Sequence, residues 1–182
     1  MICSFGNPNA TSWDAKGLPK EQIITLYASV CHPKSRGKVL LDADRRPRIV
    51  HRLFDDERDL STMIEGCRLI NQLYQTPSMQ ELVTADRNPN PIPETDDDWA
   101  VFVRAKAALG YHAVGTCRMG SDDGSVLDPE LRVRGVEGLR VADASIMPTL
   151  TSTNTNATAV MIGEKAADII AKRKIAIQPE VG

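Results

Sequence analysis

The sequence lacks the features that mark membrane, secreted and metal-binding proteins. It has 4 cysteines in 182 residues and no C-x-x-C pair, which favours free buried thiols over a metal site. No apolar run is long enough to span a membrane, and the first residues lack the basic start and apolar stretch of a signal peptide. We therefore expect a cytoplasmic protein with no membrane span and no bound metal.

A large excess of one charge sign and a phosphate-binding glycine motif are missing as well. The 22 Lys and Arg and 24 Asp and Glu residues are interspersed and give a formal net charge of −2, so no basic face is available to nucleic acid. None of the 12 glycines belongs to a G-x-G-x-x-G string, the strand-turn-helix motif that holds a dinucleotide pyrophosphate. What remains is an ordinary globular composition, 42% hydrophobic and 25% charged, in a chain long enough for a real core.

The first 110 residues predict a mostly antiparallel sheet with flanking helices, an α+β fold. Residues 1–20 are rich in glycine, proline and small polar residues and are predicted to be irregular. Three apolar segments with β-branched residues predict strands: 22–30, 38–42 and 48–53. Two helices are expected, one from Asp55 to Pro77 with apolar residues every three or four positions, and one from the capping box at Thr95 to Ala108.

The last 72 residues predict a strand, a loop and a helix in that order. Leu139 to Ala142 is an apolar segment typical of a short strand, and residues 143–153 form a loop rich in Ser and Thr. A helix is expected from Asn154, capped by Asn154 or Thr155. The start of such a helix presents backbone N–H groups to an anionic or electron-rich ligand.

His112 is the candidate for chemistry. It follows the helix end at Gly110, on a glycine-punctuated segment from which a side chain can reach a cleft. From the residues alone, two interpretations stay open: a catalytic group, or a buried histidine hydrogen-bonded to a carbonyl. His32 and His51 are interpreted as satisfied or solvent-facing histidines.

Several blocks of the chain together resemble the C-terminal part of the glucose-methanol-choline (GMC) flavoprotein oxidoreductases. The blocks are 33–39 (PKSRGKV), 111–120 (YHAVGTCRMG), 125–129 (SVLDP), 131–143 and 154–168, which begins NTNAT. They keep the family's order and spacing from about Tyr27 to Ala171. The resemblance implies that residues 1–110 belong to a substrate-binding domain and that residues 111–182 complete an FAD-binding domain and its active site.

The same resemblance implies site residues, a cofactor and partners. His112 matches the histidine that faces the reactive part of the flavin, and Asn154 matches the second catalytic position. Four further positions would contact FAD: Asp143, Ala144, Thr155 and Asn156. An imidazole accepts a hydroxyl proton near neutral pH, and an amide stabilises the developing alkoxide, so the expected reaction is hydride transfer from an alcohol substrate to FAD.

Alternatives remain for the function. A hydrolytic triad of Ser145, His112 and Asp128 has no G-x-S-x-G turn to support it. A non-enzymatic binding module or an inactive fragment that keeps the fold is the second hypothesis, because the glycine-rich motif is absent. If the chain completes a cofactor domain, its expected partner is a missing N-terminal FAD-binding half, and it should expose apolar surface around residues 139–142 and the helix after Asn154. A structure without such an exposed patch would favour an independent binding module.

Overall fold

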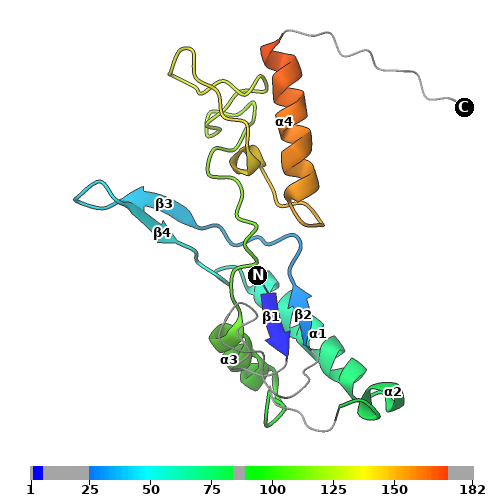
Figure 1. Ribbon diagram of the computed structural model, residues 1–182. Helices are drawn as coiled ribbons and strands as arrows, with labels where there is room; N and C mark the ends of the chain where they lie inside the picture. Colours follow the sequence, from blue (N-terminus) through cyan, green and yellow to red (C-terminus); the bar gives the residue numbers. More distant parts are fainter. Residues whose placement is uncertain (1, 6–24, 84–88, 172–182) are drawn as a thin grey trace, which may run out of the picture. The chain divides into compact units, whose positions relative to one another are not determined.

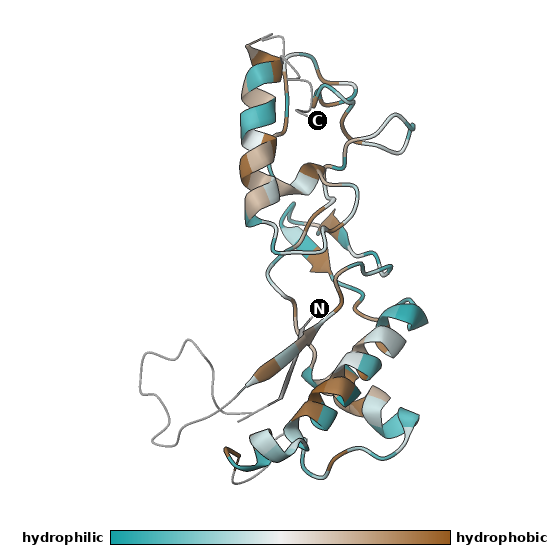
Figure 2. Cartoon of the chain, turned by 90° about the vertical axis from the view of Figure 1, so that its right-hand side faces the viewer, coloured by the Kyte–Doolittle hydropathy of each residue, from teal (hydrophilic) through white to brown (hydrophobic). Residues whose placement is uncertain are grey.

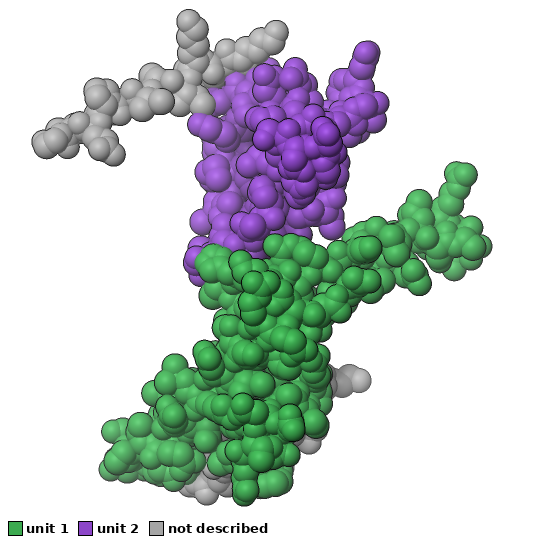
Figure 3. Space-filling view, turned by 180° about the vertical axis from the view of Figure 1, so that it is seen from behind, with its two compact units in different colours: residues 1–110 green, residues 111–182 purple. Residues whose placement is uncertain are grey.

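A computed structural model describes residues 2–5, 25–83 and 89–171. The elements in chain order are β1 (Ile2–Phe5), β2 (Leu26–Ser29), β3 (Lys38–Leu41), β4 (Pro47–Val50), α1 (Glu57–Tyr74), α2 (Pro77–Gln80), α3 (Asp96–Lys106), the 3-10 helix η1 (Ala144–Ile146) and α4 (Asn156–Ile170) (Figure 1). The chain divides into two compact units, unit 1 from Met1 to Gly110 and unit 2 from Tyr111 to Gly182 (Figure 3). Helices and antiparallel strands make this an α+β protein.

The strands of unit 1 form two separate antiparallel pairs. β1 pairs with β2 from Ile2↔Ser29 to Phe5↔Leu26, and β3 pairs with β4 from Lys38↔Val50 to Leu41↔Pro47. The antiparallel pairing is confirmed, but the prediction that the three segments form one sheet is wrong. Between β2 and β3 the backbone N–H groups of Lys34 and Ser35 bind a helix side chain, which turns the chain away from β2.

The limits of the predicted strands also need correction. Residues 2–5, predicted to be irregular, form β1. Residues 6–24 lie outside the described part of the chain, and with them the rest of the predicted irregular segment and the first residues of the strand expected over 22–30. The strand expected over 48–53 ends at Val50, because Arg52 and Phe54 take positive φ values of 51° and 59° that no strand can accommodate.

The core of unit 1 lies between α1 and α3, as the apolar spacing predicts. Asp56 caps α1, and the apolar residues of its inner face are buried: Leu60, Met63, Ile64, Cys67, Ile70 and Tyr74. Thr95 and Asp98 form the expected capping box of α3, which buries Trp99 and Val103 in the same cluster. The apolar bands of both helices are visible as brown segments in Figure 2.

The described cysteines and histidines match the expectations only in part. Among the described residues, Cys31, Cys67 and Cys117 form no disulfide bond. Cys67 is buried as predicted, but Cys117 is only half-buried, and Cys31 is exposed because it lies in the bend that follows β2. His51 is exposed, as expected of a solvent-facing histidine. In the part of the chain that the structure describes, no cluster of candidate metal ligands occurs and no helix is long and apolar enough to cross a membrane.

A buried carboxylate holds the 33–39 segment against α1. Asp59 is 2% exposed, and its two oxygens accept the N–H groups of Lys34 and Ser35, each at 2.8 Å. Burial by itself would raise the pKa of Asp59, but the hydrogen bonds from Ser35 and Lys34 outweigh it and hold the pKa below its ordinary value of 3.8. The carboxylate is therefore ionised at neutral pH, and both of its oxygens accept backbone hydrogen bonds.

Asp59→Asn should destabilise the protein by about 1–3 kcal/mol at pH 7, because an amide NH2 group cannot accept one of the two buried N–H donors. Urea unfolding followed by circular dichroism measures the change. Asp55→Asn, at an exposed position, is the control and should stay within about 0.5 kcal/mol of the unmodified chain. Equal midpoints for Asp59→Asn and Asp55→Asn would contradict the prediction.

The contribution of Asp59 should also depend on pH in a defined direction. Its folded pKa lies below the unfolded value, so the stabilisation is complete above pH 3.8 and is lost as the pH falls through the lower, folded pKa. The difference between the unmodified chain and Asp59→Asn should accordingly shrink below pH 3.8.

Unit 2 is built mostly from loops around one helix. Its core residues are Leu127, Leu131, Ile146, Met147, Ile162 and Ala166. The strand predicted over 139–142 is not formed: its residues pair with residues 131–133 through one isolated bridge, Arg132 to Arg140, flanked by the bonds from Val133 N to Leu139 O and from Val141 N to Leu131 O. The helix expected from Asn154 is present as α4, with Thr155 at its N-cap.

Candidate active site

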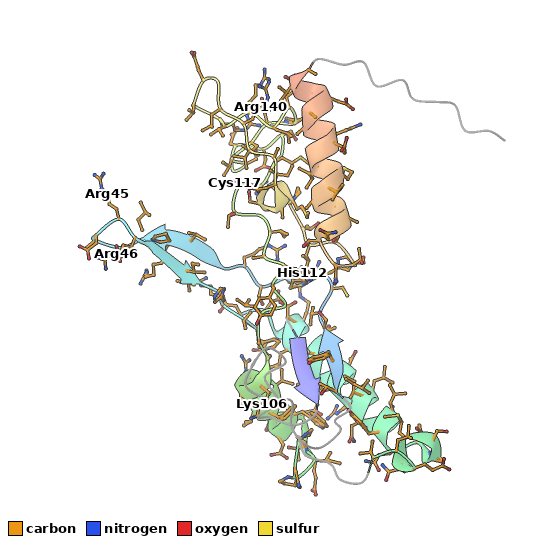
Figure 4. The ribbon with its side chains drawn as sticks, in the orientation of Figure 1. Arg45, Arg46, Lys106, His112, Cys117 and Arg140 are labelled. Atoms are coloured by element: carbon orange, nitrogen blue, oxygen red, sulfur yellow. The ribbon has the colours of Figure 1, made fainter. Side chains whose placement is uncertain are left out.

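His112 lies beside the start of α4, although the two are more than forty residues apart in the sequence. Its Nδ1 atom is 3.0 Å from the Oγ1 atom of Thr155, the N-cap residue of α4. The imidazole is half-buried, and Figure 4 shows it near the first turn of that helix. The preceding residue, Tyr111, has a φ of 59°, a left-handed conformation that redirects the chain just before His112.

Backbone hydrogen bonds join the two segments that carry the candidate residues. Cys117 N donates to Ser145 O at 3.0 Å, and Met119 N donates to Ile146 O at 2.9 Å. Gly115 supports the approach with a φ of 89°, which favours glycine. Residues 112–119 therefore run along residues 145–155, and the contacts at both ends fix the position of His112.

The first turn of α4 is open to a ligand. Thr155 makes no capping bond with its side chain, and its carbonyl accepts the N–H of Ala159 at 2.8 Å. Among the described hydrogen bonds, none takes up the N–H groups of residues 156–158. The side chains of Asn154 and Asn156 are exposed at the same end of the helix. This end can therefore bind an electron-rich group through its N–H donors.

Asp143 and Ala144 lie at η1, on the loop that leads to α4. The Asp143 carboxylate accepts hydrogen bonds from the hydroxyl and the backbone N–H of Ser145, and these bonds hold its pKa below 3.8. Asp143 is exposed and ionised at neutral pH. It can accept further hydrogen bonds from hydroxyl groups but would repel a phosphate.

A polar network among residues 118–134 was not predicted from the sequence. Arg118 binds Asp122 through two hydrogen bonds of 2.8 and 2.6 Å, which hold the pKa of that carboxyl well below its usual range. Ser125 is buried with its Oγ 2.7 Å from Asp122 O, and it accepts Arg134 Nε at 3.0 Å. The network fixes the loop after residue 117. Only the spacing of opposite charges in a glycine-rich segment could have indicated it.

Gly120 and Gly124 are part of the same arrangement. A Cβ atom at Gly120 would lie 2.8 Å from the Asp122 carboxylate, and one at Gly124 would lie 3.0 Å from the Arg118 guanidinium. The Arg118 and Asp122 side chains pack directly on these two glycines, so a larger residue at either position would displace the ion pair.

The structure brings two of the predicted site residues into contact. His112 contacts Thr155, whose direct neighbours in the chain are Asn154 and Asn156. A cavity of about 480 Å³ elsewhere in unit 2, lined by residue 128 and residues 132–140, contains none of the predicted site residues. The triad of Ser145, His112 and Asp128 finds no support, since Ser145 binds Asp143 and Asp128 binds Arg132.

These features place a half-buried histidine beside the first turn of α4, in an α+β chain. The chain belongs to the GMC oxidoreductase family, whose model matches residues 33–163. Members of this family are FAD-dependent enzymes. The chain matches the C-terminal portion of these oxidoreductases, and it is related to alcohol and choline dehydrogenases and oxidases.

Two curated relatives show the extent of the match. The alcohol dehydrogenase [acceptor] of Pseudomonas putida is 41% identical over 152 residues, which cover 82% of this chain and 28% of that enzyme. Choline oxidase of Arthrobacter globiformis is 41% identical over 157 residues, covering 82% of this chain and 29% of the oxidase. The chain thus spans less than a third of the length of these relatives.

Solved structures of the family share the fold. Aspergillus oryzae formate oxidase superposes with a TM-score of 0.78 at 30% identity, and the match covers 86% of this chain and 29% of that one. A fungal aryl-alcohol oxidase gives a TM-score of 0.73 at 35% identity, covering 81% of this chain and 25% of the oxidase.

Proposed function

We propose that this chain supplies the active-site side of an FAD-dependent enzyme that oxidises alcohols, with His112 as the base. The observation that carries the proposal is the contact between His112 and Thr155, which places an imidazole at the open start of α4 in a chain of this family. The relatives named as alcohol dehydrogenase and aryl-alcohol oxidase support alcohols as the substrate class.

In this proposal His112 and Asn154 have different roles at the substrate hydroxyl. The imidazole accepts the hydroxyl proton as the carbon-bound hydrogen leaves, and the Asn154 amide donates a hydrogen bond to the oxygen on which negative charge develops. Asn154 is exposed and directly precedes Thr155, so it belongs to the same end of α4 as the imidazole. A positioned acid–base group of this kind contributes roughly 10²–10⁴-fold to a rate.

The residues around the site fit FAD. Four residues would hold it: Asp143, Ala144, Thr155 and Asn156. The ionised Asp143 suits the hydroxyl groups of the ribityl chain better than the phosphates, and the open N–H groups of residues 156–158 suit an electron-rich ring edge. When bound, FAD accepts the hydride from the substrate carbon.

Apolar side chains on unit 2 support a missing partner for this chain. Val160 and Ile170 of α4 are each 59% exposed, Met161 is 53% exposed, and Leu139 is 49% exposed. Together with the partial coverage of the relatives, this exposure supports an N-terminal FAD-binding half that packs on unit 2. In this proposal unit 1 is part of the substrate-binding domain and unit 2 completes the FAD domain.

A graft tests the function against the alternative of an inactive fragment. Residues 33–171 would replace the matching C-terminal part of the Pseudomonas putida alcohol dehydrogenase, and the purified, FAD-loaded protein would be mixed anaerobically with a panel of primary, aromatic and amino alcohols. We expect at least one alcohol to bleach the oxidised flavin absorbance. A graft that folds and binds stoichiometric FAD, yet is bleached by no alcohol that the parent enzyme oxidises, would favour the inactive fragment.

A further inference from the structure

We propose that Thr155 is a positioning residue that fixes the tautomer of His112. Its hydroxyl oxygen accepts the Nδ1–H of the imidazole, which leaves Nε2 unprotonated and available to the substrate hydroxyl. The inference rests on the proposed function, in which His112 is the base, and it gives Thr155 a role beyond lining the cofactor site.

The geometry of Thr155 differs from that of an ordinary capping threonine. A threonine at the N-cap usually takes an extended backbone and accepts an N–H from the first helical turn with its hydroxyl. Thr155 has φ −73° and ψ −8°, a helical conformation, and its side chain makes no capping bond. The hydroxyl points instead to His112 Nδ1, 3.0 Å away. The Thr155 hydroxyl thus contacts the imidazole instead of capping α4.

The direction of this hydrogen bond decides whether His112 can act as a base. A neutral imidazole carries one N–H, so an Nδ1–H that donates to Thr155 leaves a lone pair on Nε2. In the opposite arrangement the threonine hydroxyl donates to Nδ1, and Nε2 carries the proton and cannot accept another. The proposed reaction requires the first arrangement.

The hydrogen bond also restrains the orientation of the ring. The terminal torsion of a histidine is broad and roughly two-fold, so a half-buried imidazole held only at its backbone samples flipped orientations. The backbone of His112 is fixed by the left-handed Tyr111 before it and by Gly115 after it. Thr155 adds the contact at the ring, and the reacting nitrogen is thereby held in one place.

The first test measures the tautomer in the 182-residue chain labelled with ¹⁵N-histidine. Long-range ¹H–¹⁵N correlation spectra at a pH where the ring is neutral distinguish a protonated Nδ1 from a protonated Nε2. We expect the Nδ1–H form of His112 to dominate in the unmodified chain and in Thr155→Ser, and a tautomer mixture in Thr155→Val. Thr62→Val, at an exposed site on α1, is the control for loss of a hydroxyl.

The second test measures turnover in the FAD-loaded graft. Thr155→Val should lower kcat by up to about 10²-fold with little change in KM, because a misplaced reacting group loses rate at the chemical step. Thr155→Ser keeps the hydroxyl and should retain most of the kcat of the unmodified graft. If Thr155 served packing alone, Thr155→Ser would lower kcat, because it lacks the methyl group.

The possible outcomes separate the two proposals. A graft with the unmodified sequence that oxidises no alcohol overturns the proposed function. An active graft in which Thr155→Val changes neither the His112 tautomer nor kcat overturns the positioning role alone. Urea midpoints of both variants show whether a loss of turnover reflects unfolding, and Thr155→Ser keeps the test decisive if Thr155→Val fails to fold.

Discussion

His112→Ala should lower the turnover of the FAD-loaded graft by roughly 10²–10⁴-fold, the range of a positioned general base. The alanine removes the proton acceptor at the start of α4 and leaves the α4 backbone in place. Because the lost interaction develops mainly in the transition state, kcat and kcat/KM should fall together. Anaerobic stopped-flow measurement of flavin reduction isolates this step from reoxidation.

A second histidine of the same chain provides the matched control. His51 is exposed, lies just after β4 in unit 1, and belongs to no part of the proposed site. His51→Ala should reduce flavin at the rate of the unmodified graft. If His112→Ala also turned over at a near-normal rate, His112 would be a structural histidine bound to Thr155, and the base would have to be another group.

Helices α1 and α3 could be predicted because their signals are local, whereas α2 and η1 were not predicted. The apolar spacing along α1 marks its buried face, and the capping box of Thr95 and Asp98 sets the start of α3. Each signal lies within a few residues of the feature it determines, so no knowledge of the rest of the fold is needed.

The pairing of strands could not be predicted in the same way. Strand propensity shows that Leu26–Ser29 and Lys38–Leu41 are extended, but the partner of each is chosen by contacts far along the chain. The carboxylate of Asp59 binds Lys34 and Ser35 and separates the two strands. Over residues 139–142 the apolar composition was right for a strand, yet the described chain offers only the bridge to Arg132.

The candidate site shows the same division. His112 could be singled out from its place after Gly110 and from the family resemblance, and its proposed role stays a prediction. Its contact with Thr155 could not be found from the sequence, because it joins residues 43 positions apart through a side chain that normally caps its own helix. Local rules would have assigned that hydroxyl to the first turn of α4.

The 182-residue chain by itself should neither hold FAD nor oxidise alcohols. It lacks a G-x-G-x-x-G turn, so the pyrophosphate has no close backbone approach and no contact with the helix that such a turn opens. The residues at Asp143 and at the start of α4 would offer only one side of the cofactor site. Affinity falls tenfold for each loss of about 1.4 kcal/mol, so losing several contacts takes tight binding to none that is detectable.

The measurement is a flavin fluorescence and absorbance titration of the purified chain, alone and mixed with a separately expressed N-terminal half of the Pseudomonas putida relative. We expect stoichiometric binding and alcohol-dependent bleaching only in the mixture, because the exposed apolar residues of α4 then gain a partner: Val160, Met161 and Ile170. Introducing charge there by Met161→Asp should weaken assembly while leaving His112 and Thr155 in place. Tight FAD binding by the chain alone would mean that unit 2 holds the cofactor without the glycine-rich half.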